Sequence, residues 1–358
     1  MLCPRCSRRY DDEHRFCPHD GTQLTPRPDI RRIRTKPSEN VGMVVGGRYQ
    51  VRGLIGAGGM AEVFLAQDKT TGDPVAVKIL NARHLKDPMK KARFMLEATA
   101  GAKIRHDNVL EVLDVGLRDD GAPYLVMEYL SGESLGDWLR RERVMNAAMA
   151  LPLLIQIASG LAAAHRAGIV HRDIKPGNVF LIGERGAPHT AKVVDFGFAR
   201  LAEFRGLTQA GMAVGTIEYM APEQAVGDAA EVRTDIYGLG VVMYRMFTGR
   251  IPFSMRNDAE LLAHHFLVPP PPPSLGQEGI APRIEAVVRK ALRKNLDNRY
   301  ATMDALIGDL ERVTHPSGPT VALAPITEPD EYKPLTPFAA NTAGYYRRLL
   351  SRPAPSGA

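Results

Sequence analysis

The sequence predicts an α+β protein in which a strand-rich part precedes a larger helical part. Residues 54–63 contain a glycine-rich turn between two short apolar runs, and the apolar run at 75–78 indicates a buried strand. Apolar residues then recur every three or four positions over 151–167, as in an amphipathic helix, and the segment 234–242 is strongly apolar. Strands and helices that are segregated along the chain indicate an α+β architecture.

Composition is that of an ordinary globular protein. The chain has 358 residues, of which 44% are hydrophobic and 24% are charged, and its net charge is +6. Much of this charge lies in a short N-terminal stretch, so we do not expect nucleic-acid binding. The sequence shows no run of about 18 uninterrupted apolar residues and no signal-peptide core. We therefore expect a cytoplasmic protein with no membrane span.

The stretch His171–Asn178, followed by Asp195-Phe196-Gly197, carries the chemistry. Phosphoryl transfer needs a positioned nucleophile and neutralised charge rather than covalent help from the protein. Asp173 can accept the proton of a hydroxyl, while Asn178 and Asp195 can hold magnesium ions. This pattern resembles the catalytic loop and magnesium loop of eukaryotic-like protein kinases. The phrase Gly58-Gly59-Met60 resembles the bacterial members of that family.

The resemblance covers residues 49 to 313 and implies a bilobal protein-kinase fold, with a small β-rich N-lobe and a large helical C-lobe, over 48–313. It also implies ATP and Mg²⁺ as cofactors and protein Ser/Thr hydroxyls as acceptors. Lys175 stands two residues after Asp173, as in the serine/threonine members, where it faces the transferred phosphate.

The first element, 1–23, contains all three cysteines of the chain and resembles a zinc-ribbon knuckle. Cys3 and Cys6 form a C-x-x-C pair, and Cys17 begins a second knuckle in which Asp20 occupies the place of a fourth cysteine. We predict a Zn²⁺ site made by Cys3, Cys6, Cys17 and Asp20. His19 or His14 could replace Asp20, and a tail with reduced thiols is the alternative.

The composition of two segments predicts little regular structure. Residues 24–47 combine prolines with arginines and lysines and contain few apolar residues, which predicts a flexible basic linker. Residues 314–358 are rich in Pro, Thr and Ala without periodicity, which predicts a disordered tail.

The glycine-rich stretch suits backbone amides that fold over phosphates. It departs from the G-x-G-x-x-G pattern because Ala61 replaces the third glycine, and Val63 would point toward the adenine. The resemblance assigns nucleotide contacts in this hairpin to Leu54, Gly56, Ala57, Gly58, Gly59 and Val63.

The period of two places Ala76 and Lys78 on one face of their strand. The resemblance assigns Ala76 to the adenine pocket and Lys78 to the α and β phosphates. Asp87-Pro88 is a helix start, and Glu97 on that helix is the expected partner of Lys78. Gly101 stands where the family often has a larger apolar residue, so we expect this helix to pack loosely.

Further nucleotide contacts follow from the resemblance alone. Met127 would be the gatekeeper, and the backbone of Glu128 and Leu130 would bind adenine. Phe180 would form the floor of the adenine pocket. On the apolar helix at 151–167, His165 is interpreted as a packing residue.

The segment from Asp195 to Glu223 resembles an activation segment, in which Thr216 lies near Asp173 and Lys175. Arg172 marks kinases whose activation loop is ordered by phosphate, so we predict autophosphorylation at Thr208, which a transient homodimer could carry out in trans. Asp235 would brace the catalytic loop, and Arg299 would pair with Glu223, because either charge would be costly to bury singly.

Two other classes of function are possible. A pseudokinase scaffold would bind nucleotide or partners without turnover, but such a protein is free to lose Lys78, Glu97, Asp173, Asn178 and Asp195, all of which are present. A small-molecule phosphotransferase would not need the peptide-docking segment 215–223, which is complete.

Overall fold

The computed structural model describes residues 1, 3, 10–11, 13–19, 21–24, 30–184, 186–196, 217–255, 257–275, 280–314, 341, 344 and 347. They fall into two compact units. Unit one comprises Met1–Glu133 and Phe180–Ala199, and unit two comprises Ser134–Val179 and Arg200–Ala358. Each unit is described by itself.

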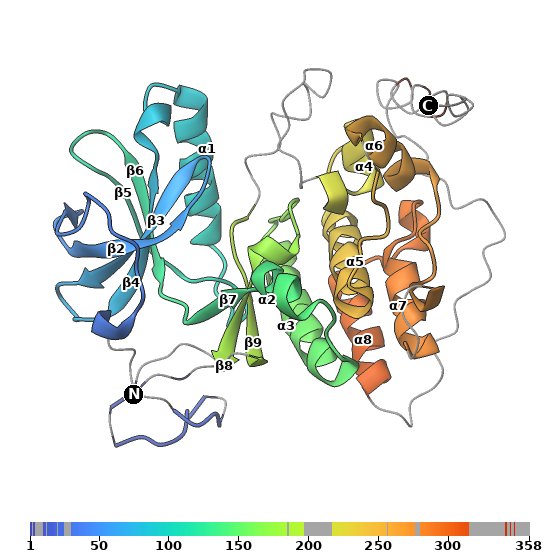
Figure 1. Cartoon of the computed structure of the whole chain (residues 1–358), viewed down its shortest axis with the longest axis horizontal. Helices are drawn as coiled ribbons and strands as arrows, with labels where there is room; N and C mark the ends of the chain where they lie inside the picture. The colour runs from blue at the N-terminus through green and yellow to red at the C-terminus, as the bar shows by residue number, and fades with distance from the viewer. Residues whose placement is uncertain are drawn as a thin grey trace. The chain divides into compact units, whose positions relative to one another are not determined.

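A six-stranded antiparallel sheet forms the body of unit one (Figure 1). Its spatial order is β1-β2-β3-β4-β6-β5. The strands are β1 (Val44–Val45), β2 (Tyr49–Ala57), β3 (Ala61–Asp68), β4 (Pro74–Leu80), β5 (Val112–Leu117) and β6 (Pro123–Glu128).

The alternation of side chains divides the sheet into two apolar faces. Val75, Val77 and Ile79 of β4 pack in one cluster with Phe64 and Val126. Their neighbours along the strands lie in a second cluster, on the face that helix α1 (Pro88–Gly101) covers; it contains Ala61, Ala76, Leu80, Phe94, Ala98, Leu125 and Met127. Strands β3, β4 and β6 therefore each present one face to each cluster, as a period of two requires.

Helix α1 begins where the sequence predicts. Asp87 is its N-cap, and its carboxylate accepts the backbone amides of Met89 and Lys90. At the other end, Gly101 is buried, and a Cβ atom there would lie 3.1 Å from Cγ2 of Val112. The glycine therefore allows α1 to approach β5 closely. The expectation of a loosely packed helix did not take this close contact into account.

The predicted flexible linker differs from the structure over residues 30–47. A 3₁₀ turn, η1 (Ile30–Arg32), is followed by an antiparallel bridge in which Lys36 and Leu54 exchange backbone hydrogen bonds of 2.8 and 3.2 Å. Strand β1 then pairs with β2. The segment is ordered because the edge of β2 supplies backbone partners, which composition alone does not reveal.

A second, three-stranded sheet has the order β7-β8-β9. Its strands are β7 (Gly132–Ser134), β8 (Val179–Glu184) and β9 (Ala187–Val193). At the start of β7, a Cβ atom on Gly132 would lie 1.9 Å from the carbonyl oxygen of Leu181, so this pairing tolerates no side chain.

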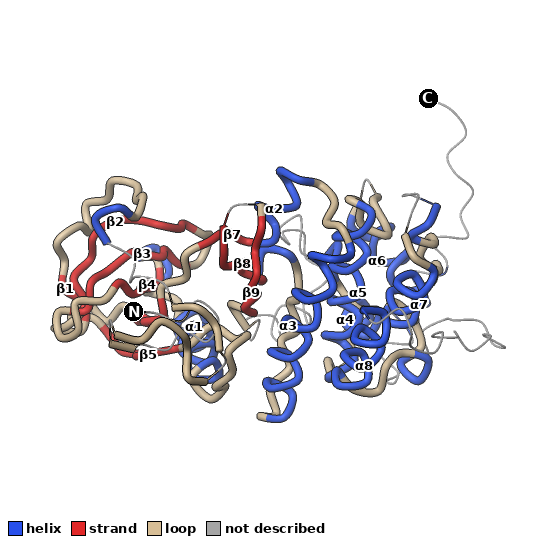
Figure 2. Tube along the Cα trace, turned by 90° about the horizontal axis from the view of Figure 1, so that it is seen from below, coloured by secondary structure: helices blue, strands red, loops and turns tan. Residues whose placement is uncertain are grey.

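Unit two is helical (Figure 2). Helix α3 begins four residues before the predicted helix at 151–167, because Asn146 caps it by accepting the amide of Met149 at 3.0 Å. The helices are α2 (Leu135–Glu142), α3 (Ala147–Arg166), α4 (Pro222–Val226), α5 (Val232–Thr248), α6 (Asp258–Leu267), α7 (Pro282–Ala291) and α8 (Met303–Thr314).

Helix α3 packs against α5 and α8. In the part of the chain that the structure describes, it is the one helix long and apolar enough to cross a membrane, with a mean hydropathy of 1.8. Within that window, 56% of the residues are buried inside the protein, as in the core helix of a globular domain.

The disordered tail at 314–358 stays a prediction, because the structure describes only Thr314 and three later residues of this segment. Asn341, Gly344 and Arg347 are helical, and the Arg347 guanidinium lies 6.0 Å from the ring centroid of Phe266 on α6. Short 3₁₀ turns complete the fold at η2 (Ala82–His84), η3 (Pro176–Asn178), η6 (Ile217–Tyr219), η7 (Pro273–Leu275) and η8 (Leu296–Asn298).

Candidate active site

In unit one, Lys78 lies between two carboxylates. Its Nζ is 2.9 Å from Glu97 Oε1 and 2.7 Å from Asp195 Oδ1. Burial lowers the pKa of Lys78, but the charges and hydrogen bonds of Asp195 and Glu97 outweigh burial, so its pKa is raised. The ammonium group therefore stays charged at neutral pH, and the predicted contact of Lys78 with Glu97 is present.

Three separate elements bring these side chains together. Lys78 and Ala76 share a face of β4, and Glu97 comes from α1, which packs on that sheet. Asp195 follows β9 and has a φ of +53°, in the left-handed region that non-glycine residues rarely adopt. Such backbone strain is often found at functional sites. The Asp195 side chain is 48% exposed, so its carboxylate can meet a ligand from solvent.

The glycine-rich hairpin lies where the sequence predicts. Strand β2 ends at Ala57 and β3 begins at Ala61, so Gly58 and Gly59 form the exposed tip. The tip closes through a hydrogen bond of 2.9 Å from the Gly58 amide to the carbonyl oxygen of Ala61. Gly56 is paired with Val63 in the ladder just before this tip.

One predicted nucleotide contact is corrected. Leu54 packs against the cluster that contains Phe64, its cross-strand partner. Ile55 lies on the opposite face, with Val63 and Ala76. The alternation of side chains therefore places Ile55, not Leu54, on the face assigned to adenine. The register of β2 against β3, which pairs Leu54 with Phe64, decided this point, and the sequence does not show that register.

The predicted hinge follows β6. Met127 is 5% exposed and packs in the same cluster as Ala76. Leu130 and Phe180, both in unit one, are half-buried. The backbone amide of Glu128 donates to the carbonyl oxygen of Glu111 at 3.1 Å.

Sequence reasoning missed a buried ion pair beside this hinge. Lys192, which is 2% exposed, donates from Nζ to Oε1 of Glu128 at 2.6 Å. The same carboxylate oxygen accepts the backbone amide of Glu111 at 2.8 Å. A lysine inside the apolar run before Asp195 was the signal in the sequence, since a buried cation needs an anionic partner.

In unit two, Asp173 is the centre of a short polar cluster. Its Oδ2 accepts hydrogen bonds from Nζ of Lys175 at 2.7 Å and from Nδ2 of Asn178 at 3.2 Å. Asn178 also donates to the Asp173 carbonyl at 2.8 Å. Both bonds of Asn178 use its amide nitrogen, so the amide oxygen is the atom that could bind a cation.

Asp235 holds the loop that carries this cluster. Its two oxygens accept the backbone amides of His171 at 2.8 Å and Arg172 at 2.7 Å, as predicted. His165 was interpreted as a packing residue, but its Nε2 lies 2.7 Å from Oδ2 of Asp235. This interpretation was therefore incomplete. The two residues are 70 positions apart, so no local pattern in the sequence indicates their contact.

Arg172 has a φ of +68°, which is also left-handed. Its carbonyl oxygen accepts a hydrogen bond of 2.9 Å from Gln224, a contact that the sequence did not indicate. In the described part of the chain, Nε and Nη1 of Arg172 are buried and make no hydrogen bond. Burial lowers the pKa of this guanidinium, and the charge of Asp235 opposes that shift.

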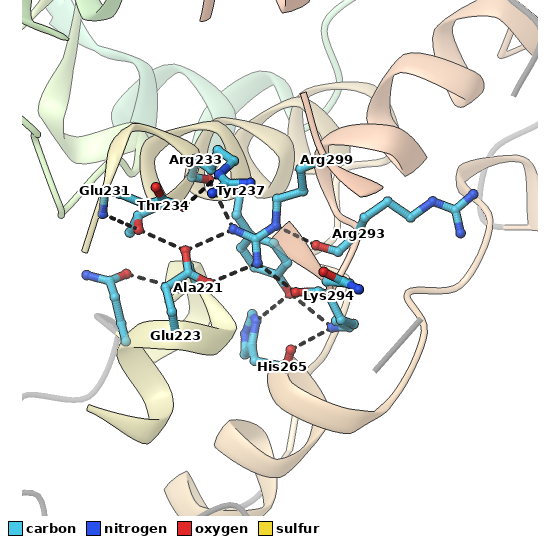
Figure 3. Close-up of polar contacts among 12 residues, drawn as sticks. Ala221, Glu223, Glu231, Arg233, Thr234, Tyr237, His265, Arg293, Lys294 and Arg299 are labelled. Carbon is cyan, nitrogen blue, oxygen red and sulfur yellow. Dashed lines mark hydrogen bonds and ion pairs between the residues drawn. The ribbon is translucent and has the colours of Figure 1, made fainter. Parts of the chain in front are cut away.

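The predicted pair of Arg299 and Glu223 is present (Figure 3). Thr234 donates a further hydrogen bond of 2.8 Å to the Glu223 carboxylate. Beside this pair, Figure 3 shows Lys294, which is fully buried and donates to Tyr237 at 3.0 Å and to the carbonyl oxygen of His265 at 2.8 Å.

Several predicted residues lie outside the described part of the chain. These are Cys6, Asp20, Gly197, Thr208 and Thr216. Among the residues that are described, no group of three or more His, Cys, Asp or Glu is arranged to hold a metal. Cys3 and Cys17 are both buried and pack in one small cluster with Leu24.

Comparison with known proteins agrees with this geometry. The sequence profile of the Protein kinase domain matches residues 49–308. The chain belongs to the protein kinase family. The kinase domain is similar to the serine/threonine-protein kinase pkn3 of Myxococcus xanthus, with 37% identity over 77% of this chain and 51% of the relative. It is also similar to the serine/threonine-protein kinase PknB of Mycobacterium leprae, with 38% identity over 85% of this chain and 49% of the relative.

The chain therefore spans about half the length of these curated relatives. Among solved structures, the PknI kinase domain of Mycobacterium tuberculosis is similar. It has a TM-score of 0.60 and 26% identity, and the match covers 76% of this chain and 98% of that one.

Proposed function

We propose that this protein is a serine/threonine protein kinase that transfers the γ-phosphoryl group of Mg-ATP to protein hydroxyls. The observation that carries the proposal is the contact of Asp173 with both Lys175 and Asn178 on a loop that Asp235 holds by its backbone. The match to the kinase profile and to serine/threonine-protein kinases supports it.

Asp173 would orient the acceptor hydroxyl and take its proton as the new P–O bond forms. Lys175 is already within hydrogen-bonding distance of Asp173, so its ammonium group would lie beside the phosphoryl group during transfer. Charge placed in advance where negative charge develops lowers the barrier without reorganisation.

Lys78 would bind the phosphates of ATP, and Glu97 would hold it in position. Carboxylate and amide oxygens are ligands that Mg²⁺ prefers, which Asp195 and the Asn178 amide oxygen fit. When bound, magnesium neutralises charge on the phosphates. We propose Ile55, Val63, Ala76 and Met127 as the lining of the adenine pocket.

The test is phosphate transfer from labelled ATP by the wild-type chain and by Asp173→Asn, with magnesium present. Asp173→Asn keeps the size of the side chain and removes the base. We expect transfer to serine or threonine to fall by about 10²-fold or more, since general base catalysis contributes that much. Unchanged transfer in the variant would contradict the role of Asp173. Nucleotide binding without any transfer by the wild type would favour a pseudokinase scaffold.

We further propose that Thr208 is autophosphorylated, in trans within a transient homodimer. A phosphate there would offer oxygen acceptors to the buried guanidinium of Arg172. Mass spectrometry of the wild type and Thr208→Ala tests this, with Thr302→Ala as the control. Full activity of an unphosphorylated chain would contradict it.

A structural zinc site at residues 1–23 is a separate proposal. Cys17 begins a tight turn in which its amide donates to Thr22 at 2.7 Å and its carbonyl accepts from Gly21 at 2.8 Å. Two buried sulfurs beside such a turn suit zinc. We keep Asp20 as the fourth ligand, because its spacing from Cys17 repeats the three-residue step between Cys3 and Cys6. We also propose that the protein is cytoplasmic, where thiols stay reduced.

Metal analysis of the purified chain tests the zinc site, with Cys17→Ser and His19→Ala as paired variants. About one zinc per chain, lost in Cys17→Ser and kept in His19→Ala, is the expected result. Zinc-free protein purified under reducing conditions would contradict it.

A further inference from the structure

The segment that follows β4 contacts the tip of the glycine-rich hairpin. Strands β3 and β4 are paired as far as Ala61 and Leu80, and the Asn81 amide then donates to the carbonyl oxygen of Met60 at 3.0 Å. The tip extends beyond this point, where β4 no longer supplies backbone partners. Its carbonyl oxygens therefore take their hydrogen bonds from water or from neighbouring side chains.

Three side chains supply these donors. Asn81 Nδ2 donates to the carbonyl oxygens of Gly58 at 3.1 Å and Gly59 at 3.3 Å. Arg83 donates to the Gly59 oxygen at 2.6 Å, and His84 Nε2 lies 3.0 Å from the same atom. Two glycine carbonyls thus receive four contacts from one short segment, which we call the clasp (residues 81–84).

The tautomer of His84 follows from its neighbours. Its Nδ1 lies 3.0 Å from Nζ of Lys90, an ammonium group that can only donate. Nδ1 is therefore the acceptor, and Nε2 carries the hydrogen that is donated to Gly59. Lys90 belongs to α1, the helix that also carries Glu97, so the clasp is itself oriented by that helix.

The clasp determines the direction of the tip amides. In a trans peptide the carbonyl and the N–H point to opposite sides, and the structure has no cis peptide bond among the residues described. Because the Gly58 and Gly59 carbonyls point to the clasp, the amides of Gly59 and Met60 point away from it. Backbone amides displayed by such a turn are suited to phosphate oxygens.

We propose that Asn81, Arg83 and His84 are positioning residues that order the glycine-rich tip for binding of the ATP phosphates. This proposal rests on the proposed kinase function. Glycine loses more conformational freedom on ordering than any other residue. A tip that is held before the nucleotide arrives reduces the ordering cost of binding. The clasp begins three residues after Lys78, so one strand end places both the lysine and the tip.

Asn81→Asp is the sharpest test, because it keeps the size of the side chain but replaces a donor by an acceptor facing two carbonyl oxygens. We expect Mg-ATP to bind about fivefold to tenfold more weakly, the effect of losing one or two hydrogen bonds. Hydrogen exchange over residues 56–61 of the nucleotide-free protein should become faster. At saturating ATP, kcat should change less than about twofold, so the effect falls on KM.

Arg52→Ala is the matched control, since Arg52 contacts Gln67 on β3 rather than the tip.

If Asn81→Asp lowers the melting temperature, a second pair of variants, His84→Gln and His84→Phe, decides instead. Glutamine keeps a hydrogen-bond donor and phenylalanine does not, so His84→Gln must bind Mg-ATP more tightly than His84→Phe. Equal affinities of that pair would overturn the proposal. Affinity and exchange in Asn81→Asp equal to those of the control would also overturn it, as would tighter binding, which would mean that the contacts oppose the nucleotide. Binding and exchange are measured without catalysis, so they decide this point even if the wild type transfers no phosphate.

Discussion

Arg299 and Glu223 form two parallel hydrogen bonds of 2.9 Å, and both side chains are fully buried. The guanidinium also donates to the carbonyl oxygens of Arg293 and Lys294. The pair thereby ties the start of α4 to the segment before η8, within unit two. Bidentate geometry and further hydrogen bonds are what a buried ion pair needs to offset the cost of desolvation.

We expect Arg299→Met to lower the free energy of unfolding by about 3 to 5 kcal/mol, because it leaves the Glu223 charge buried without its main partner. Chemical denaturation measures this loss. The control is Arg166→Met, whose guanidinium is exposed and lies 3.5 Å from Asp304. An exposed pair contributes at most about 1 kcal/mol. Equal losses in both variants would contradict the importance of burial.

The same pair predicts how stability depends on acid. Burial raises the pKa of Glu223, but the charge and hydrogen bonds of Arg299 outweigh burial, so the pKa lies below its ordinary value of 4.5. A carboxyl with a lowered folded pKa contributes stability above its unfolded pKa and loses it as pH falls through the folded pKa. Glu223→Gln should therefore weaken the fall in stability below about pH 4.5. Parallel curves for wild type and variant in acid would refute this.

Asp235→Asn should impair catalysis more than its effect on folding explains. The substitution replaces one acceptor oxygen by an NH₂ group. The backbone amides of His171 and Arg172 can only donate, so one of them would face a second donor. The catalytic loop would shift, and a displacement of about 1 Å can reduce a rate by about 10²-fold. Measuring kcat and the melting temperature separates the two effects. Asp304→Asn is the exposed control, and an unchanged kcat in Asp235→Asn would disprove the bracing role.

Gly132→Ala should be strongly destabilising. The added Cβ would lie 1.9 Å from a backbone oxygen of β8, and backbone cannot move aside as a flexible side chain does. We expect a loss of about 3 kcal/mol or more in the free energy of unfolding, at the upper end of overpacking effects. Gly177→Ala, where a Cβ would meet nothing within 4 Å, is the matched substitution and should cost far less. Similar losses at both sites would show that the β7-β8 pairing is looser than described.

Some features of the structure could be predicted from neighbouring residues in the sequence, and others only from the family resemblance. The hairpin, the face shared by Ala76 and Lys78, and the start of α1 at Asp87 were all predictable, because each depends on neighbours within a few positions. The contacts of Lys78 with Glu97 and of Glu223 with Arg299 join distant residues. They were predicted from the order of motifs that the family shares, not from local pattern.

Neither the direction of side chains in β2 nor the order of the linker could be predicted from the sequence. Leu54 and Ile55 are both apolar, so only the register of β2 against β3 decided which one faces Val63. The linker at 30–47 looked too polar to be ordered, but backbone hydrogen bonds to β2 do not depend on composition.

The sequence by itself determined the kinase motifs, their order and the strand and helix patterns that surround them, because these are properties of residue type and spacing. The tertiary structure alone decided that Lys192 neutralises Glu128, that His165 meets Asp235, and that Asn81 holds the glycine-rich tip. In each case a buried or half-buried polar group needs a partner, but chemistry specifies only the kind of partner. Which residue supplies it depends on how the chain folds back on itself.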